Sequence, residues 1–112
     1  MSTRVYGLRG ATGAANTPES IQQHVVELCR TLFSDNGVTG DDLVSIHFTM
    51  TKDLNALNPC FALRHGDVGI DVSQCALFAS QEADIVGAPE GLIRVLVTTY
   101  LETGAKLRHC YI

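Results

Sequence analysis

The sequence lacks the features that mark membrane proteins and nucleic-acid-binding proteins. No apolar run is long enough to span a bilayer, and the first residues contain no apolar core of a secretion signal. Only two of the 112 residues are Lys, and the net charge is −4 because twelve acidic residues outnumber eight basic ones. Such a chain has no basic stripe that could displace counterions from phosphates. We therefore expect no nucleic acid partner, no membrane and a reducing, cytoplasmic location.

Cysteine and histidine are present, but their spacing indicates neither a metal site nor a redox pair. The four Cys form no CxxC pair, and the four His follow no ligand pattern. A Gly-x-Ser-x-Gly nucleophile elbow is also absent, and no Ser or Cys is marked out as a nucleophile. The sequence therefore predicts no metal, no cofactor and no covalent catalysis.

The composition is typical of one globular domain over residues 1–112, with 46% hydrophobic and 18% charged residues. The apolar pattern predicts an α+β fold: a mixed sheet of about five strands, with one long helix after the first strand. The expected strands are residues 3–9, 43–50, 75–80, 92–99 and 107–112. Glycines at positions 7, 10 and 13 are interpreted as a turn that ends the first strand, with Arg9 at its mouth.

The long helix has clear signals at both ends. In the segment 17–19, Thr is a good N-cap, Pro fits the first helical position, and Glu places an acid in the first turn. Four apolar residues then recur at helical spacing, and the helix is expected to end at Gly37. A less regular segment follows the second strand. We expect a short helix over 53–57 capped by Thr51, and a second helical turn that ends at Arg64.

The run from Leu92 to Thr99 predicts a central strand that is covered on both faces, because both of its faces are apolar. Arg94 is the one charged residue in this run. A buried guanidinium needs an anion, since Arg cannot escape by losing its proton. Two interpretations follow: an internal ion pair with Glu82, or a pocket that binds an anionic ligand.

Three arginines occupy notable positions: Arg9 ends the first expected strand, Arg64 ends the short helical segment, and Arg94 lies inside the apolar strand. Arg64 either caps helical carbonyls or reaches over a pocket as part of a lid. The planar guanidinium suits carboxylate and phosphate groups. Together with Glu82 and Tyr111, these residues suit a small dianion with a hydroxyl group, which is held and electrostatically stabilised rather than attacked.

Several segments, in the same order over nearly the whole chain, resemble the monofunctional bacterial chorismate mutases of the AroH class. They are Arg9-Gly10-Ala11-Thr12, Thr51-Lys52-Asp53-Leu54-Asn55-Ala56, Asn58-Pro59, Ala62-Leu63-Arg64, Gln81-Glu82-Ala83-Asp84-Ile85, Gly87, Ile93-Arg94-Val95 and Leu107-Arg108-His109-Cys110-Tyr111. The resemblance implies a homotrimer with a barrel-like core and an active site in each cleft between neighbouring subunits. It also implies the reaction, the pericyclic Claisen rearrangement of chorismate to prephenate. This step of aromatic amino acid biosynthesis, in the shikimate pathway, needs no cofactor or metal.

The resemblance also assigns roles to residues. Arg94 would stabilise the negative charge that develops on the breaking ether oxygen, and Glu82 would accept a hydrogen bond from the ring hydroxyl while orienting Arg94. Arg9 and Tyr111 would bind the side-chain carboxylate. Arg64 would come from the neighbouring subunit and lie near the ring carboxylate, at the solvent mouth of the site.

The chain departs from the family pattern at a few positions. Phe78 and Ala79 would line the floor of the site, where Ala79 replaces a Cys that touches the hydroxyl region. Asn58 stands where the family has an aromatic residue that covers the substrate, and Phe61 stands where a Lys can occur. The chain also ends at Ile112, where family members continue into further strand and a tail. We expect the mutase chemistry to survive these changes with weaker binding. The alternatives are a relative that acts on a modified chorismate-like dianion, or a non-catalytic trimeric binding protein.

Overall fold

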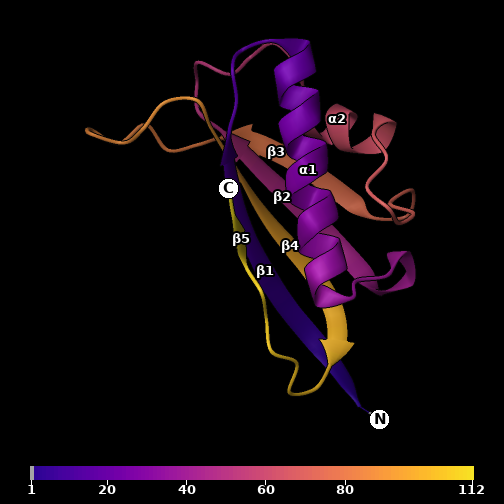
Figure 1. Ribbon diagram of the computed structural model, residues 1–112. Coiled ribbons are helices and arrows are strands. Elements are labelled where there is room, and N and C mark those ends of the chain that lie inside the picture. Colours follow the sequence, from indigo (N-terminus) through magenta and orange to yellow (C-terminus); the bar gives the residue numbers. More distant parts are fainter. Residues whose placement is uncertain (1) are drawn as a thin grey trace.

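The computed structural model describes residues 2–112, which form a five-stranded mixed sheet with two helices on one side. The elements are β1 (Thr3–Gly13), α1 (Pro18–Asn36), a 3-10 turn (Gly40–Asp42), β2 (Leu43–Met50), α2 (Pro59–His65), β3 (Ala76–Gln81), β4 (Leu92–Glu102) and β5 (Cys110–Tyr111). The strand order is β3-β2-β4-β1-β5 (Figure 1). The strands β1 and β2 run antiparallel to β4, whereas β3 and β5 run parallel to their neighbours. The expected α+β class and mixed sheet are confirmed. No helix within residues 2–112 is long and apolar enough to cross a membrane.

Helix α1 forms where its capping signals predict it. The Thr17 side chain accepts a hydrogen bond from the Ser20 N–H at 3.1 Å, and Pro18 occupies the first turn. Gly37 ends the helix in the left-handed conformation at φ 62°, which a residue with a Cβ adopts at a cost. The apolar stripe of α1 packs on the sheet and forms the core with residues of β1, β2 and β4. These core residues are Ile21, Val25, Leu28, Leu32, Phe33, Leu8, Ile46, Phe48, Ile93 and Val97.

Strand β4 lies at the centre of the sheet as expected, but the prediction that both its faces are covered is wrong for the chain. Ile93, Val95 and Val97 are buried, whereas Arg94 and Leu96 on the alternate face are exposed. The physical reason is that α1 and α2 lie on the same side of the sheet, as Figure 1 shows. The opposite side, which we call the open face, is therefore accessible. Arg94 consequently lies at the surface of the chain and is not buried within it.

The glycines at 7, 10 and 13 lie within strand β1 and not in a turn, so that interpretation is wrong. Gly10 faces the core, where it pairs with Cys110 of β5. A Cβ at position 10 would lie 2.9 Å from the Cys110 carbonyl oxygen and 3.0 Å from Leu28 Cδ1. Glycine at position 10 therefore serves close packing, because it lets β5 and α1 approach strand β1 without a clash.

We expect Gly10→Ala to destabilise the fold by about 1–3 kcal/mol, because the added methyl overpacks against the backbone of β5. The matched control is Gly7→Ala in the same strand, where a Cβ would make only an ordinary contact of 3.5 Å with Leu96. Urea denaturation of both variants measures the difference. Equal midpoints for the two variants would show that the close approach at Gly10 has no energetic consequence.

Two short elements differ from their expected bounds because side chains satisfy their backbone groups. No helix forms over 53–57, since the Asn16 side chain accepts hydrogen bonds from the backbone N–H groups of Asn55 and Ala56, both at 2.9 Å. The last strand is limited to Cys110–Tyr111, not residues 107–112. Before it, the Asn36 side chain pairs with both backbone groups of Arg108, at 2.8 Å each. Both differences arise from contacts between segments that are distant in sequence.

Candidate active site

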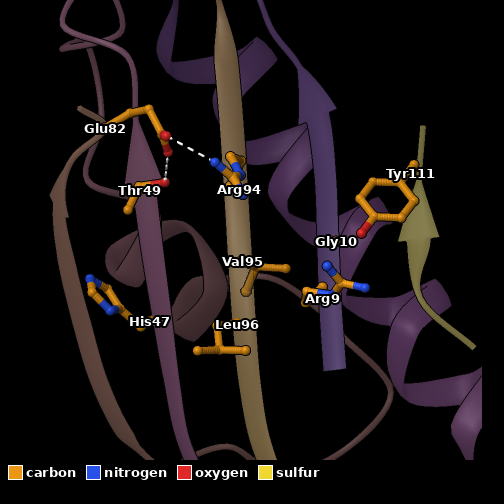
Figure 2. A pocket seen from close by; sticks show the side chains of 9 residues that line it. All are labelled: Arg9, Gly10, His47, Thr49, Glu82, Arg94, Val95, Leu96 and Tyr111. Atoms are coloured by element: carbon orange, nitrogen blue, oxygen red, sulfur yellow. Dashed lines mark hydrogen bonds and ion pairs between the residues drawn. The ribbon is translucent and has the colours of Figure 1, made fainter. Parts of the chain in front are cut away.

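A cleft of about 320 Å³ lies on the open face of the sheet, across β2, β4, β1 and β5. Figure 2 shows the residues that line it: Arg9, Gly10, His47, Thr49, Glu82, Arg94, Val95, Leu96 and Tyr111. Four of the residues singled out in the sequence, namely Arg9, Glu82, Arg94 and Tyr111, thus meet in one cleft. They come from distant segments of the chain, so the fold itself assembles this group.

Strand register places these side chains on one face. Thr49 of β2 lies directly opposite Arg94 of β4, and Arg9 of β1 lies opposite Leu96 of β4. Because alternate residues of a strand point to the same face, Arg94 and Leu96 both line the cleft. Figure 2 shows Tyr111 and Arg9 on one side of Arg94, with Glu82 on the other. The Arg94 guanidinium therefore lies near the middle of the cleft, between the Glu82 carboxylate on one side and Arg9 with Tyr111 on the other.

Glu82 is held by two donors, one on each carboxylate oxygen. Arg94 Nη1 donates to Oε2 at 3.0 Å, and the Thr49 hydroxyl donates to Oε1. Hydrogen bonding by Thr49, followed by the nearby Arg94 charge, lowers the pKa of Glu82 below its ordinary value of 4.5. The Glu82 side chain is only 18% exposed, whereas that of Arg94 is 57% exposed. The interpretation that Arg94 pairs with Glu82 is therefore confirmed. Arg94 also faces an open cleft, and an anionic ligand in that cleft stays a prediction.

The lowered pKa of Glu82 links the stability of the fold to pH. A carboxylate with a depressed folded-state pKa stabilises the fold above its unfolded-state pKa, and this contribution is lost as pH falls through the folded-state value. We therefore expect the wild-type free energy of unfolding to fall more steeply below about pH 5 than that of Glu82→Gln. Urea denaturation as a function of pH tests this.

The control for this measurement is Asp84→Asn, because Asp84 pairs with Lys52 at 3.0 Å but is 66% exposed. An exposed ion pair contributes little to stability. We expect Asp84→Asn to follow the wild-type curve closely. A Glu82→Gln curve parallel to that of the wild type would contradict a special contribution from Glu82.

Four other residues expected at the site lie outside this cleft within the described chain. Arg64, in the last turn of α2, borders a separate cleft. Asn58 and Ala79 line a groove of about 400 Å³ beside strand β3. Phe78 is 65% exposed on β3, with its ring edge against His47. Asn58 has a structural task of its own, because its side chain accepts a hydrogen bond from Cys60 N and caps α2.

The sequence reasoning missed Thr49 and His47, which both line the cleft. A signal for them was present: Ile46 and Phe48 mark the buried face of β2, so the alternating residues His47 and Thr49 must point to the opposite face. Their proximity to Glu82 could not be inferred, because it depends on how β2 and β3 pair. His47 forms a hydrogen bond with Ser80 across this pairing, at 2.9 Å.

The fold and the cleft together define a class of protein: an α+β domain whose open sheet face carries a cleft lined by guanidinium, phenol and carboxylate groups, which suit a small anionic molecule. Guanidinium and phenol groups supply donors for carboxylates, and Glu82 supplies an acceptor. Within residues 2–112, no three His, Cys, Asp or Glu side chains gather in a group that could hold a metal ion.

Comparison with known proteins identifies the family. The model of the family "Chorismate mutase type I" matches residues 5–112. The AroH chorismate mutase of Thermus thermophilus is 32% identical over 111 residues, which cover 96% of this chain and 88% of that protein. The Bacillus subtilis AroH chorismate mutase is 30% identical over 112 residues, which cover 96% of this chain and 84% of that protein. A solved chorismate mutase from Clostridium thermocellum matches with a TM-score of 0.83 at 32% identity, over 96% of this chain and 94% of that chain. The chain therefore belongs to the chorismate mutase type I family and is an isomerase, which confirms the resemblance noted in its sequence.

Proposed function

We propose that this isomerase rearranges chorismate to prephenate in the cleft on the open face. The observation that carries the proposal is the position of Arg94: its guanidinium is fixed by Glu82 at 3.0 Å, yet its side chain is 57% exposed to the cleft. In the rearrangement, a carbon–oxygen bond breaks while a carbon–carbon bond forms, and negative charge develops on the ether oxygen. A preorganised cation at that oxygen stabilises the transition state without any proton transfer.

The other cleft residues bind and orient the substrate. Arg9 and Tyr111 bind the side-chain carboxylate, and Glu82 accepts a hydrogen bond from the ring hydroxyl. These contacts hold the molecule in the compact conformer in which the two reacting carbons meet, which removes an entropic part of the barrier. Because the reaction also proceeds without a catalyst, a reduction of the barrier by about 8 kcal/mol or somewhat more is sufficient for an enzyme.

We further propose that three copies associate through their open faces, so that each active site lies between two subunits. This is supported by large apolar side chains on the open face, where Val5, Phe78, Leu96 and Tyr100 are each at least 40% exposed. Exposed apolar surface of this kind is typical of an interface. In this assembly, Arg64 of the neighbouring subunit reaches the ring carboxylate. Asn58 caps the same helix, α2, so the neighbouring subunit also supplies it to the site.

Phe78 and Ala79 complete the site in this assembly as parts of its floor. Both belong to strand β3, which neighbours β2 at the edge of the sheet. All four cysteines are free thiols, which supports a reducing, cytoplasmic location for the enzyme.

The experiment that tests this function is direct. Purified protein is mixed with chorismate, the loss of diene absorbance is followed, and prephenate is confirmed by its conversion to phenylpyruvate in acid. We expect fast, saturable loss of chorismate and stoichiometric formation of prephenate. A folded protein that binds prephenate but converts no chorismate would instead indicate a binding protein, or an enzyme for a modified dianion.

A further inference from the structure

We infer that Thr49 is a positioning residue, which keeps Arg94 available to the substrate by holding Glu82 in a fixed orientation. The inference rests on the proposed function and adds to it a residue that does not itself contact the reacting atoms. Three observations carry it: the two separate donors on Glu82, the strand register that brings them together, and the free donors that remain on Arg94.

Both the backbone and the side chain of Glu82 are fixed by hydrogen bonds. The Glu82 backbone N–H donates to the Met50 carbonyl at 2.8 Å, which holds the start of the loop after β3 against strand β2. The Thr49 hydroxyl donates a hydrogen bond to Oε1 of Glu82, and Arg94 Nη1 donates one to Oε2 at 3.0 Å (Figure 2). Because Thr49 and Arg94 are direct cross-strand neighbours, both donors reach Glu82 from adjacent strands. The carboxylate therefore cannot rotate without breaking one of these hydrogen bonds.

The arrangement leaves Arg94 only partly engaged. Within residues 2–112, Nη1 is the one guanidinium nitrogen that hydrogen-bonds to the protein, so its other donors remain for a ligand. Arginine and carboxylate groups favour a two-pronged pairing that uses two parallel N–H donors. Thr49 opposes this pairing because it occupies Oε1. Without the hydroxyl, we expect Glu82 to turn onto Arg94 and take a second donor from it.

This geometry predicts a particular kinetic effect. The interaction of Arg94 with the ether oxygen strengthens as negative charge develops there. Loss of free donors on Arg94 therefore weakens the binding of the transition state more than the binding of the substrate. We expect Thr49→Val, which has nearly the same shape, to lower kcat about tenfold or more while KM changes little. Thr49→Ser retains a hydroxyl and is expected to restore most of the activity.

The pH profile gives a second readout that packing alone would not move. In Thr49→Val, Glu82 exchanges the neutral Thr49 donor for a second donor from the charged Arg94 guanidinium, which is expected to lower the pKa of Glu82 further. Loss of the Thr49 hydrogen bond without this re-pairing would instead raise the pKa, because that bond is the first cause of its lowering. The acid limb of kcat/KM is therefore expected to move to lower pH in Thr49→Val and to stay near the wild-type position in Thr49→Ser. The charged or titratable groups that face Glu82 across the two adjoining clefts are Arg94, His47, Arg9, Tyr111, Lys52, Asp53, Asp84 and Glu90. Profiles are therefore repeated in a His47→Leu background, so that the imidazole does not contribute to the limb.

A measurement without substrate separates this inference from the proposed function. The Glu82 carboxyl is titrated by ¹³C NMR in the wild type, Thr49→Ser, Thr49→Val and, should the Val variant fail to fold, Thr49→Ala. A lower pKa in the variants without a hydroxyl supports the inference, even in an enzyme that converts another substrate. An unchanged or higher pKa of Glu82 in those variants, wild-type kcat in Thr49→Val, or an equal loss of kcat in Thr49→Ser and Thr49→Val would overturn it.

Discussion

Replacing Arg94 by Ala is expected to lower kcat/KM for chorismate by about 100-fold or more, with most of the loss in kcat. The guanidinium is the cation on β4 that faces the cleft and is held against Glu82 at 3.0 Å. Its removal takes away the stabilisation of the developing charge and also leaves the Glu82 carboxylate without its cation. Both effects raise the barrier in the same direction.

The chain offers a matched control for this variant in Arg30. Arg30 also pairs with a carboxylate, that of Asp67, at 2.9 Å, and its side chain is 50% exposed, close to the exposure of Arg94. It belongs to helix α1 and does not line the cleft. We expect Arg30→Ala to retain wild-type kinetics. An Arg94→Ala variant that keeps most of the wild-type kcat would refute the electrostatic role of Arg94.

A mixture of two inactive variants is expected to regain activity, because Arg64 and Arg94 of one site come from different subunits in the proposed trimer. Arg64→Ala and Arg94→Ala are unfolded together in equal amounts and refolded, so that mixed trimers form. With random assembly, about one half of the sites keep Arg94 and about one half of these meet an intact Arg64, so about a quarter of wild-type activity returns. Steady-state turnover of chorismate measures the recovery.

The control mixture combines Arg94→Ala with Glu82→Ala. These two residues form an ion pair within one chain, so no arrangement of mixed subunits restores both to the same site. We expect this mixture to stay inactive. If the Arg64→Ala and Arg94→Ala mixture also stays inactive, Arg64 is not supplied across an interface.

Elements with local signals could be predicted from the sequence. Helix α1 has its cap, its proline and its terminal glycine within its own segment, so its bounds follow from residues 17–37 alone. The central place of β4 also followed from its apolar run, and the pair of Arg94 with Glu82 was one of the two interpretations that the sequence left open. These features depend on short-range rules or on simple charge complementarity.

Features that depend on distant contacts could not be predicted in this way. Gly10 resembles a turn residue until β5 and α1 are placed beside it. The segment around Asn55 resembles a helix until the Asn16 side chain takes its N–H groups. The apolar open face of β4 indicated a covering layer, yet the chain itself supplies none there. Thr49 was missed because its importance arises from its register with Arg94.

The central claim is that chorismate reacts on the open face of the sheet, against Arg94 and beneath a neighbouring subunit. A crystal structure with bound prephenate tests this claim most directly. We predict that prephenate lies within hydrogen-bond distance of Arg94 and Glu82, with Arg64 of a second copy at the mouth of the site. Prephenate bound out of reach of Arg94 and Glu82, or enclosed by a single chain, would contradict the account.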